Sequence, residues 1–214
     1  ITIAGNMVAQ AELRTIISEI DAFGNAYTTF KTRYKMPPGD LNTAYTLWGS
    51  DCGASAAACN GNGNYAIVAN YGAISNETAK AWKHLDRASL LDYPVAAIPG
   101  TYTGVLNYDN APKSKAREVG YYMASGGDIG GDFAALASPF NAISSITNGL
   151  FIGTPSSTGG FTVGALTANE AFAIDKKIDD AVINSGGTAI GANSGSIRTI
   201  EDQAATGGCL SSGK

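Results

Sequence analysis

The first 35 residues constrain this chain most, because they have the pattern of one long amphipathic helix. Apolar side chains recur there at steps of three and four residues, the spacing of one helix face. They are Leu13, Ile16, Ile17, Ile20, Phe23, Tyr27, Phe30 and Tyr34. No proline interrupts the run before Pro37. Such a helix is roughly 50 Å long, which exceeds the diameter of a small domain. We therefore expect one end to project or to pack against something else.

The pattern divides this helix into two parts. From about Ile16 to Tyr34, large side chains at helical spacing predict burial against the rest of the domain. From Ile1 to about Ala11 the residues are small and apolar around most of the helix, which predicts exposure in the isolated domain. The candidate assembly residues in this first part are Ile1, Ile3, Met7 and Val8. The alternative is an ordinary core helix with a frayed start.

Composition narrows the class of protein. A chain of 214 residues suits one generous domain, or one and a half, and is long enough to bury a sizeable core. The net charge is −4 and the basic residues are scattered, which argues against a nucleic-acid surface. Charged residues make up only 15%, and the 27 glycines suggest an exported, loop-rich protein. No signal peptide and no apolar run of about 18 residues is present, so we expect that a targeting segment has been removed.

Three cysteines are present, Cys52, Cys59 and Cys209. A zinc site usually needs four clustered Cys or His ligands, and the chain has one histidine. We therefore predict a disulfide formed in an oxidising compartment. The short spacing of Cys52 and Cys59 favours a bond between them, although Cys209 could take either partner.

The remaining elements follow from local signals. Pro37 and Pro38 end the long helix, and Asp40 is expected to cap a short helix over residues 41–48. A second helix is expected from Ser75 or Asn76 to about Leu91, and a third begins with the capping-box spacing of Thr167 and Glu170. Strands are expected at residues 120–124, 150–153, 161–163 and 196–200.

A search for reactive groups finds no catalytic constellation, and we expect no enzyme. The chain lacks a nucleophile elbow and a phosphate-binding loop. Its only histidine, His84, adjoins Trp82 and Leu85 on a helix pattern and is interpreted as a packed structural residue.

Acidic residues raise one possible cation site. Asp128 and Asp132 lie in a glycine-rich turn, and Asp175 and Asp179 are one helical turn apart, where they repel unless neutralised. No organic cofactor is expected, and calcium is the candidate ion. A flexible acidic turn and a neutralising lysine are the plainer alternatives. Asn60, Asn62 and Asn64 alternate as in some calcium loops but carry no charge.

Four motifs in order then resemble the bacterial type IV pilin-like proteins, the pilins and pseudopilins made with a prepilin cleavage and methylation signal. The motifs follow the helix that begins with Ala11-Glu12-Leu13-Arg14. They are Met36-Pro37-Pro38-Gly39-Asp40, Cys59-Asn60-Gly61-Asn62-Gly63, Ala81-Trp82-Lys83-His84-Leu85 and Ala173-Ile174-Asp175-Lys176-Lys177-Ile178-Asp179-Asp180. The family's cleavage glycine, first aromatic residue, acidic fifth residue and most of its apolar span are missing. Ala181 also replaces a family glycine.

The resemblance implies an α+β, pilin-like fold with a long N-terminal helix packed on an antiparallel sheet. It divides the chain into residues 1–35, the filament-forming helix, and residues 36–214, the globular head. It also implies a structural subunit of a type IV pilus or a type II secretion pseudopilus. Some pseudopilins bind calcium, which supports the candidate site.

The expected partners are further copies of the chain in a helical filament, related minor subunits, the inner membrane through the missing span, and prepilin peptidase for the precursor. The expected location is the bacterial cell surface or the periplasm. A DNA-uptake filament and either a major or a minor subunit stay open. The alternative function is an extracellular binding or adhesin module presented on such a filament.

Overall fold

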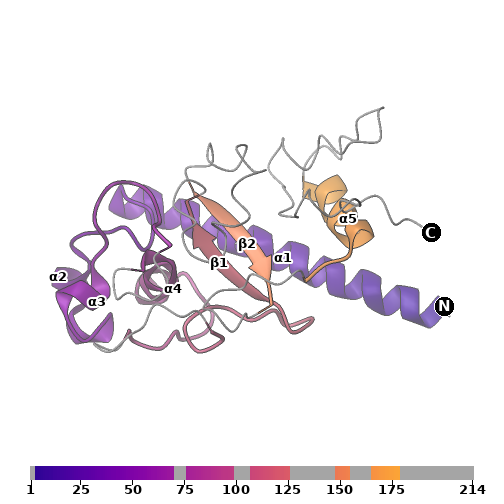
Figure 1. The fold of residues 1–214 in the computed structure, drawn as a ribbon, viewed down its shortest axis with the longest axis horizontal. Coiled ribbons are helices and arrows are strands. Elements are labelled where there is room, and N and C mark those ends of the chain that lie inside the picture. Colours follow the sequence, from indigo (N-terminus) through magenta and orange to yellow (C-terminus); the bar gives the residue numbers. More distant parts are fainter. Residues whose placement is uncertain (1–2, 70–75, 99–106, 126–147, 155–164, 179–214) are drawn as a thin grey trace, which may run out of the picture.

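The computed structural model describes residues 3–69, 76–98, 107–125, 148–154 and 165–178 of the chain. Their architecture is α+β, with one long helix, several short helices and a small antiparallel sheet. Figure 1 shows the long helix α1 running behind the sheet, with its N-terminal turns extending beyond the rest of the body. The α+β class expected from the sequence is therefore confirmed.

Helix α1 spans Ile3–Tyr34, as the apolar periodicity predicts. Along its second half, Phe23 and Phe30 are buried, with 7% and 0% of their surfaces exposed. The helix ends where Lys35 takes a positive φ of 60° and Pro37 follows. A proline at this position stops the helix, because it has no backbone N–H to donate and its ring clashes with a carbonyl of the preceding turn.

Strand β1 (Gly120–Ala124) pairs antiparallel with β2 (Gly149–Gly153), so two of the expected strands are confirmed. Tyr122 lies opposite Phe151, and their rings stack with centroids 4.8 Å apart. Every residue of β1 is buried. The expected strands at residues 161–163 and 196–200 lie outside the described residues.

Aromatic rings join α1, β1 and α4 (Glu77–Arg87) into one core. Phe23 of α1 packs edge to face on Trp82 of α4 and on Tyr121 of β1, at 5.0 Å in both cases. Such pairs add about 0.5–1.5 kcal/mol each beyond their buried area. Phe23 thus contacts both the sheet and α4, and Phe30 of α1 adds a second contact with α4 by stacking on His84 at 6.0 Å.

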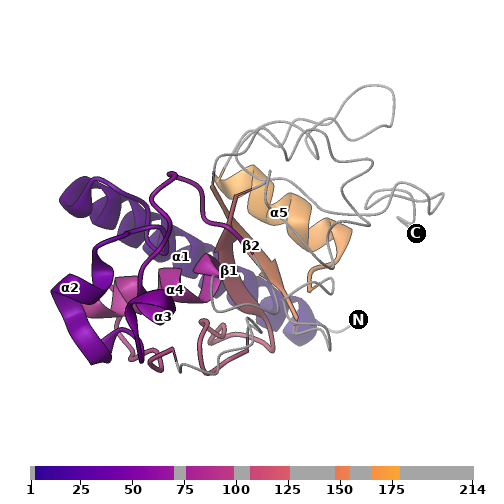
Figure 2. The same ribbon diagram turned by 60° about the vertical axis from the view of Figure 1, so that its left-hand side comes forward.

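Three short elements form the end of the molecule near the C-terminus of α1 (Figure 2). They are α2 (Ala44–Trp48), the 3₁₀ turn η1 (Gly49–Asp51) and α3 (Ala56–Cys59). The expected helix over residues 41–48 is therefore shorter than predicted and begins at Ala44. The predicted cap is wrong, because Thr43 occupies that position without a side-chain bond and Asp40 bonds elsewhere. Helix α4 has Asn76 as its cap and ends at Arg87, before the predicted Leu91.

Helix α5 (Ala168–Ile178) lies against the first half of α1. Its predicted capping box is confirmed, since the Glu170 amide donates to Thr167 Oγ1 at 3.3 Å and the Thr167 amide donates to Glu170 Oε2 at 2.8 Å. Arg117 Nη2 reaches both Glu12 of α1, at 2.6 Å, and Glu170, at 2.9 Å. One guanidinium therefore connects the two helices. Within the described ranges, no helix is long and apolar enough to cross a membrane.

Candidate functional site

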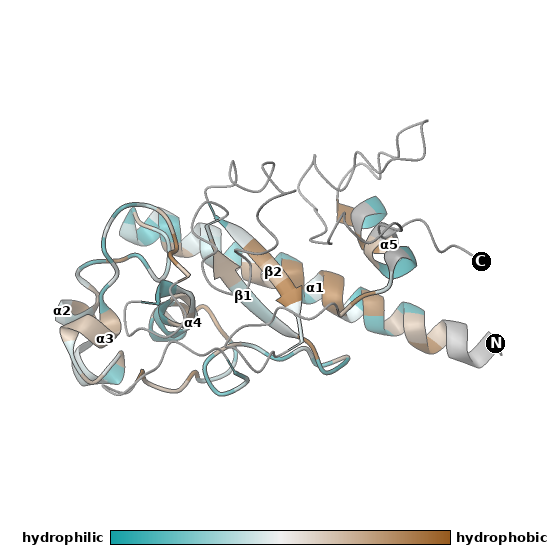
Figure 3. Ribbon diagram, viewed as in Figure 1, coloured by the Kyte–Doolittle hydropathy of each residue, from teal (hydrophilic) through white to brown (hydrophobic). Residues whose placement is uncertain are grey.

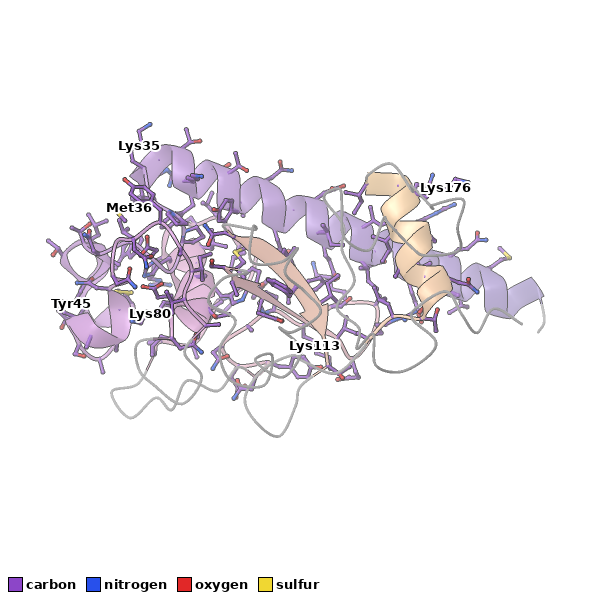
Figure 4. The ribbon with its side chains drawn as sticks, turned by 45° about the horizontal axis from the view of Figure 1, so that its top comes forward. Lys35, Met36, Tyr45, Lys80, Lys113 and Lys176 are labelled. Atoms are coloured by element: carbon purple, nitrogen blue, oxygen red, sulfur yellow. A yellow bond between two sulfur atoms is a disulfide. The ribbon has the colours of Figure 1, made fainter. Side chains whose placement is uncertain are left out.

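Residues 60–68 form a segment without helix or strand that is held by buried polar side chains from two other parts of the chain. We call this segment the latched loop. We call four buried side chains that help to hold it, Asp40, Glu77, Lys80 and His84, the polar latch. All four residues are nearly or fully buried, with 0–2% of their surfaces exposed. The half-buried Asn148 also contacts the loop, since its Oδ1 accepts the Ile67 amide at 2.8 Å and its Nδ2 donates to the Tyr65 carbonyl at 2.9 Å. Figure 4 shows Lys80 on the side of the molecule where Tyr45 lies, far from Lys176 of α5.

Asp40 accepts three backbone amides of the latched loop. Its Oδ1 is 2.6 Å from the Gly63 nitrogen and 3.1 Å from the Asn64 nitrogen, and its Oδ2 is 2.6 Å from the Tyr65 nitrogen. Hydrogen bonds to a carboxylate are about twice as strong as neutral ones. Burial raises the pKa of Asp40, and the amide bonds oppose that rise. Asp40 therefore fixes three consecutive residues.

Glu77 holds the two flanks of the same loop. Its Oε1 accepts the Asn62 amide at 2.7 Å, and its Oε2 accepts the Val68 amide at 2.9 Å. The residue lies in the first turn of α4, where free amides and the helix dipole favour a negative charge. Burial nevertheless raises the pKa of Glu77 to about 7. Ionised Glu77 is consequently costly to bury although it is well bonded.

Lys80 and His84 hold the start of the loop. Lys80 Nζ donates to the Asn60 carbonyl at 2.8 Å, and burial lowers the pKa of this lysine. His84 Nδ1 accepts the Gly39 amide at 2.9 Å, which leaves Nε2 to carry the proton and to donate to the Cys59 carbonyl at 2.8 Å. Burial lowers the pKa of His84 to about 4. His84 is thus fully buried, as the sequence analysis expects of a packed structural histidine.

The geometry of the latch follows from helix spacing and from two glycines. Glu77, Lys80 and His84 are three and four residues apart, so they share one face of α4. Gly61 lies so close to the backbone of Asp40 that an added Cβ would lie 2.2 Å from the Asp40 Cα. At Gly39, whose φ is +87°, a Cβ would lie 2.5 Å from the Glu77 carbonyl oxygen. Only glycine permits these approaches.

The loop begins at a disulfide. Cys52 and Cys59 are bonded, with Cα atoms 5.4 Å apart, as their spacing predicts. Closing so short a ring stabilises the fold by roughly 2–3 kcal/mol in the chain-entropy model. Cys209 lies outside the described residues.

The disulfide lies beside the histidine of the latch. The potential ligand atoms of Cys52, Cys59 and His84 lie within 4.8 Å of one another. They do not suit a metal in this form, because the two sulfurs bond each other and both ring nitrogens already hold hydrogen bonds.

The side chains of all four predicted calcium ligands lie outside what the structure describes. Asp128, Asp132 and Asp179 lie outside the described ranges, and Asp175 lies in α5 with its side chain outside the description. The three alternating asparagines instead bond to backbone. Asn60 Oδ1 accepts the Tyr45 amide, Asn62 Oδ1 the Asn64 amide and Asn64 Oδ1 the Ala66 amide. Calcium binding therefore stays a prediction.

The start of α1 is the second candidate surface. Met7 and Val8 are 66% and 60% exposed, whereas Ile16, about two turns further on, is fully buried. Figure 3 shows hydrophobic residues on the turns of α1 that extend beyond the body. Ile3 belongs to α1, but its side chain is outside the description, and Ile1 precedes the described residues. We define the described part of this surface as the Met7–Val8 patch.

Comparison with protein-family models, with curated proteins and with solved structures finds no match. The site is therefore interpreted from its own geometry.

Sequence reasoning missed the latch as a unit. Trp82 and Leu85 mark α4 as a core helix, and the polar residues at positions 77, 80 and 84 lie on the same helix. A signal was present, since Glu77, Lys80 and His84 recur at helical spacing on the helix that carries Trp82 and Leu85, and ionisable groups buried beside such a core need polar partners. Their partners could not be named, because Asp40 and its amide donors are separated by 23 to 25 residues.

Proposed function

We propose that this protein is a structural subunit of a type IV pilus-like or type II secretion pseudopilus filament, and that it assembles through its N-terminal helix. The observation that carries the proposal is the division of α1. Its later turns are buried in the domain, while Met7 and Val8 are exposed beyond it. Large apolar side chains exposed on a projecting helix favour packing against another chain.

The motif order supports the same proposal. The turn at Asp40, the loop after Cys59 and the helix containing His84 carry three of the four pilin-like motifs, and these meet in the polar latch. Each latch group is bonded to backbone, an arrangement suited to fixing a loop rather than to binding a substrate. The latch would thus keep the head rigid at one end of α1 while the other end packs in a filament.

In the proposed filament, copies of the chain and related minor subunits contact one another through the starts of their α1 helices. An upstream apolar segment would hold the precursor in the inner membrane, where prepilin peptidase would process it. Small and apolar residues on helices permit close packing between neighbouring helices. The proposed location is the bacterial surface or the periplasm.

Electron microscopy of the full-length gene product in its bacterial host tests the proposal. Wild-type protein is expected to form filaments, and Val8→Asp is expected to abolish them by placing a charge in the helix–helix contact. The matched control is Thr29→Asp, which changes an exposed position of the same helix beside the head. Filaments of normal number and length from Val8→Asp would contradict the proposal.

A further inference from the structure

The latched loop contains two copies of the dipeptide most prone to spontaneous deamidation, Asn60–Gly61 and Asn62–Gly63. In this reaction the glycine nitrogen loses its proton and attacks the asparagine Cγ. A C–N bond forms and ammonia leaves, which gives a succinimide. Water then opens the ring to aspartate or isoaspartate, and no oxidant or reductant takes part. Glycine permits the attack because it has no Cβ to hinder the approach.

The structure places the two dipeptides in different surroundings. Asn60 is half-buried, its Oδ1 accepts the Tyr45 amide at 2.7 Å, and the following Gly61 nitrogen donates to the Leu41 carbonyl at 3.1 Å. Gly61 is also pressed against the Asp40 backbone. Both reacting groups at this dipeptide are thus held by the protein, and neither can turn without moving buried backbone.

Asn62 is exposed, and its side-chain oxygen bonds only within the loop, to the Asn64 amide at 3.0 Å. The nitrogen that would attack it, that of Gly63, donates to Asp40 Oδ1 at 2.6 Å. The attacking nitrogen is therefore held by the Asp40 carboxylate, while Glu77 holds the Asn62 amide at 2.7 Å. Opening of the loop at Asp40 frees the nitrogen without disturbing Asn60.

We infer that Asn62 is a deamidation site whose rate is set by the polar latch, and that Asn60 is protected in the same loop. Conversion of Asn62 to isoaspartate lengthens the backbone by one carbon and adds a negative charge beside Asp40 and Glu77. The longer backbone shifts the Gly63, Asn64 and Tyr65 amides relative to Asp40, so the carboxylate can no longer accept all three. Deamidation at Asn62 thus opens the latch irreversibly, and this inference does not depend on the filament proposal.

The experiment compares the two asparagines within one molecule. The oxidised chain and a peptide of residues 57–68 are incubated at mildly alkaline pH, and peptide mapping with isoaspartate detection follows each site. Both sites are expected to react at similar rates in the peptide. In the folded chain, Asn62 is expected to react at least about tenfold more slowly than in the peptide, as an opening free energy of about 1.4 kcal/mol produces. Asn60 is expected to stay intact over the same period.

Asp40→Asn is expected to accelerate the reaction at Asn62, because an amide nitrogen then faces one of the loop amides. Glu118→Gln, at an exposed carboxylate, is the control and should leave the rate unchanged. Since Asp40→Asn could unfold, hydrogen exchange of the Gly63 amide is also measured in the wild-type chain at low urea concentrations. Deamidation should rise in parallel with that exchange.

Three results would overturn the inference. One is equal reaction of Asn60 and Asn62 in the folded chain, and another is a folded-chain rate at Asn62 equal to that of the peptide. The third is an intact Asn62 under conditions in which the Gly63 amide exchanges freely.

Discussion

Glu77 and His84 lie about two turns apart on α4 and respond to pH in opposite directions. The pKa of Glu77 is raised from 4.5 to about 7, so the folded state binds this proton more tightly than the unfolded chain. The resulting stabilisation is complete below pH 4.5 and is lost as the pH rises to about 7. The pKa of His84 is lowered from 6.5 to about 4, so its contribution is present above pH 6.5 and is lost as the pH falls.

The two slopes overlap and oppose each other, which yields a paired prediction. In Glu77→Gln the histidine remains, so the free energy of unfolding should rise with pH between about pH 5 and pH 6.5. In His84→Gln the glutamate remains, so the free energy of unfolding should fall over the same range. Each slope is at most about 1.4 kcal/mol per pH unit. Urea unfolding at several pH values measures both. Glu118→Gln, an exposed carboxylate, should keep the wild-type profile. Slopes of the same sign in the two latch variants would contradict this account.

At the scale of an element, Gly24 weakens the middle of α1. It is exposed, and a Cβ added there meets nothing within 4 Å. Gly24→Ala should therefore raise the free energy of unfolding by about 0.5–1 kcal/mol, because alanine loses less conformational entropy in a helix. The denaturant midpoint measures the change. Gly61→Ala is the contrasting variant and should destabilise, since its Cβ would collide with the Asp40 backbone.

Helix α5 depends on contacts separate from the main core. Ile16 of α1 and Ile174 of α5 are almost fully buried, yet neither belongs to the main core cluster. Arg117 connects the same two helices through Glu12 and Glu170. Arg117→Ala should thus speed amide hydrogen exchange in α5 and leave α4 unchanged. Lys113→Ala removes an exposed ion pair and should have no such effect. Unaltered exchange in α5 would show that apolar contact alone holds it.

Local signals predicted the elements, and distant contacts decided the site. Apolar periodicity predicted α1, and the spacing of Thr167 and Glu170 predicted the start of α5. Cys52 and Cys59 are close enough in sequence for their bond to be inferred. The local pattern predicts Asp40 as a helix cap, and this prediction is wrong. A carboxylate before a short helix has the same pattern whether it bonds the next turn or a loop more than 20 residues away. The spacing of residues along the sequence does not show which distant backbone amides will donate to the Asp40 carboxylate.

At the scale of the whole molecule, α1 is exposed near its start and buried in the domain further along. Val8 is 60% exposed, and Ile16 on the same helix is 0% exposed. Val8→Asp should therefore change the free energy of unfolding of the 214-residue chain by less than about 1 kcal/mol, as surface substitutions do. Ile16→Asp should destabilise it severely, because it places an unpaired charge in a buried contact. Ile20 is only half-buried, so Ile20→Asp should lower the free energy of unfolding less than Ile16→Asp does.

Chemical denaturation of the two variants beside Thr29→Asp measures this division directly. Thr29 is exposed on the part of α1 that packs on the head, so its variant reports the cost of a new charge on the helix alone. Equal stability of Val8→Asp and Thr29→Asp, together with loss of the folded state in Ile16→Asp, is the expected pattern. If Val8→Asp unfolds the chain as Ile16→Asp does, the start of α1 is part of the domain core. The filament proposal would then lose the exposed surface on which it rests.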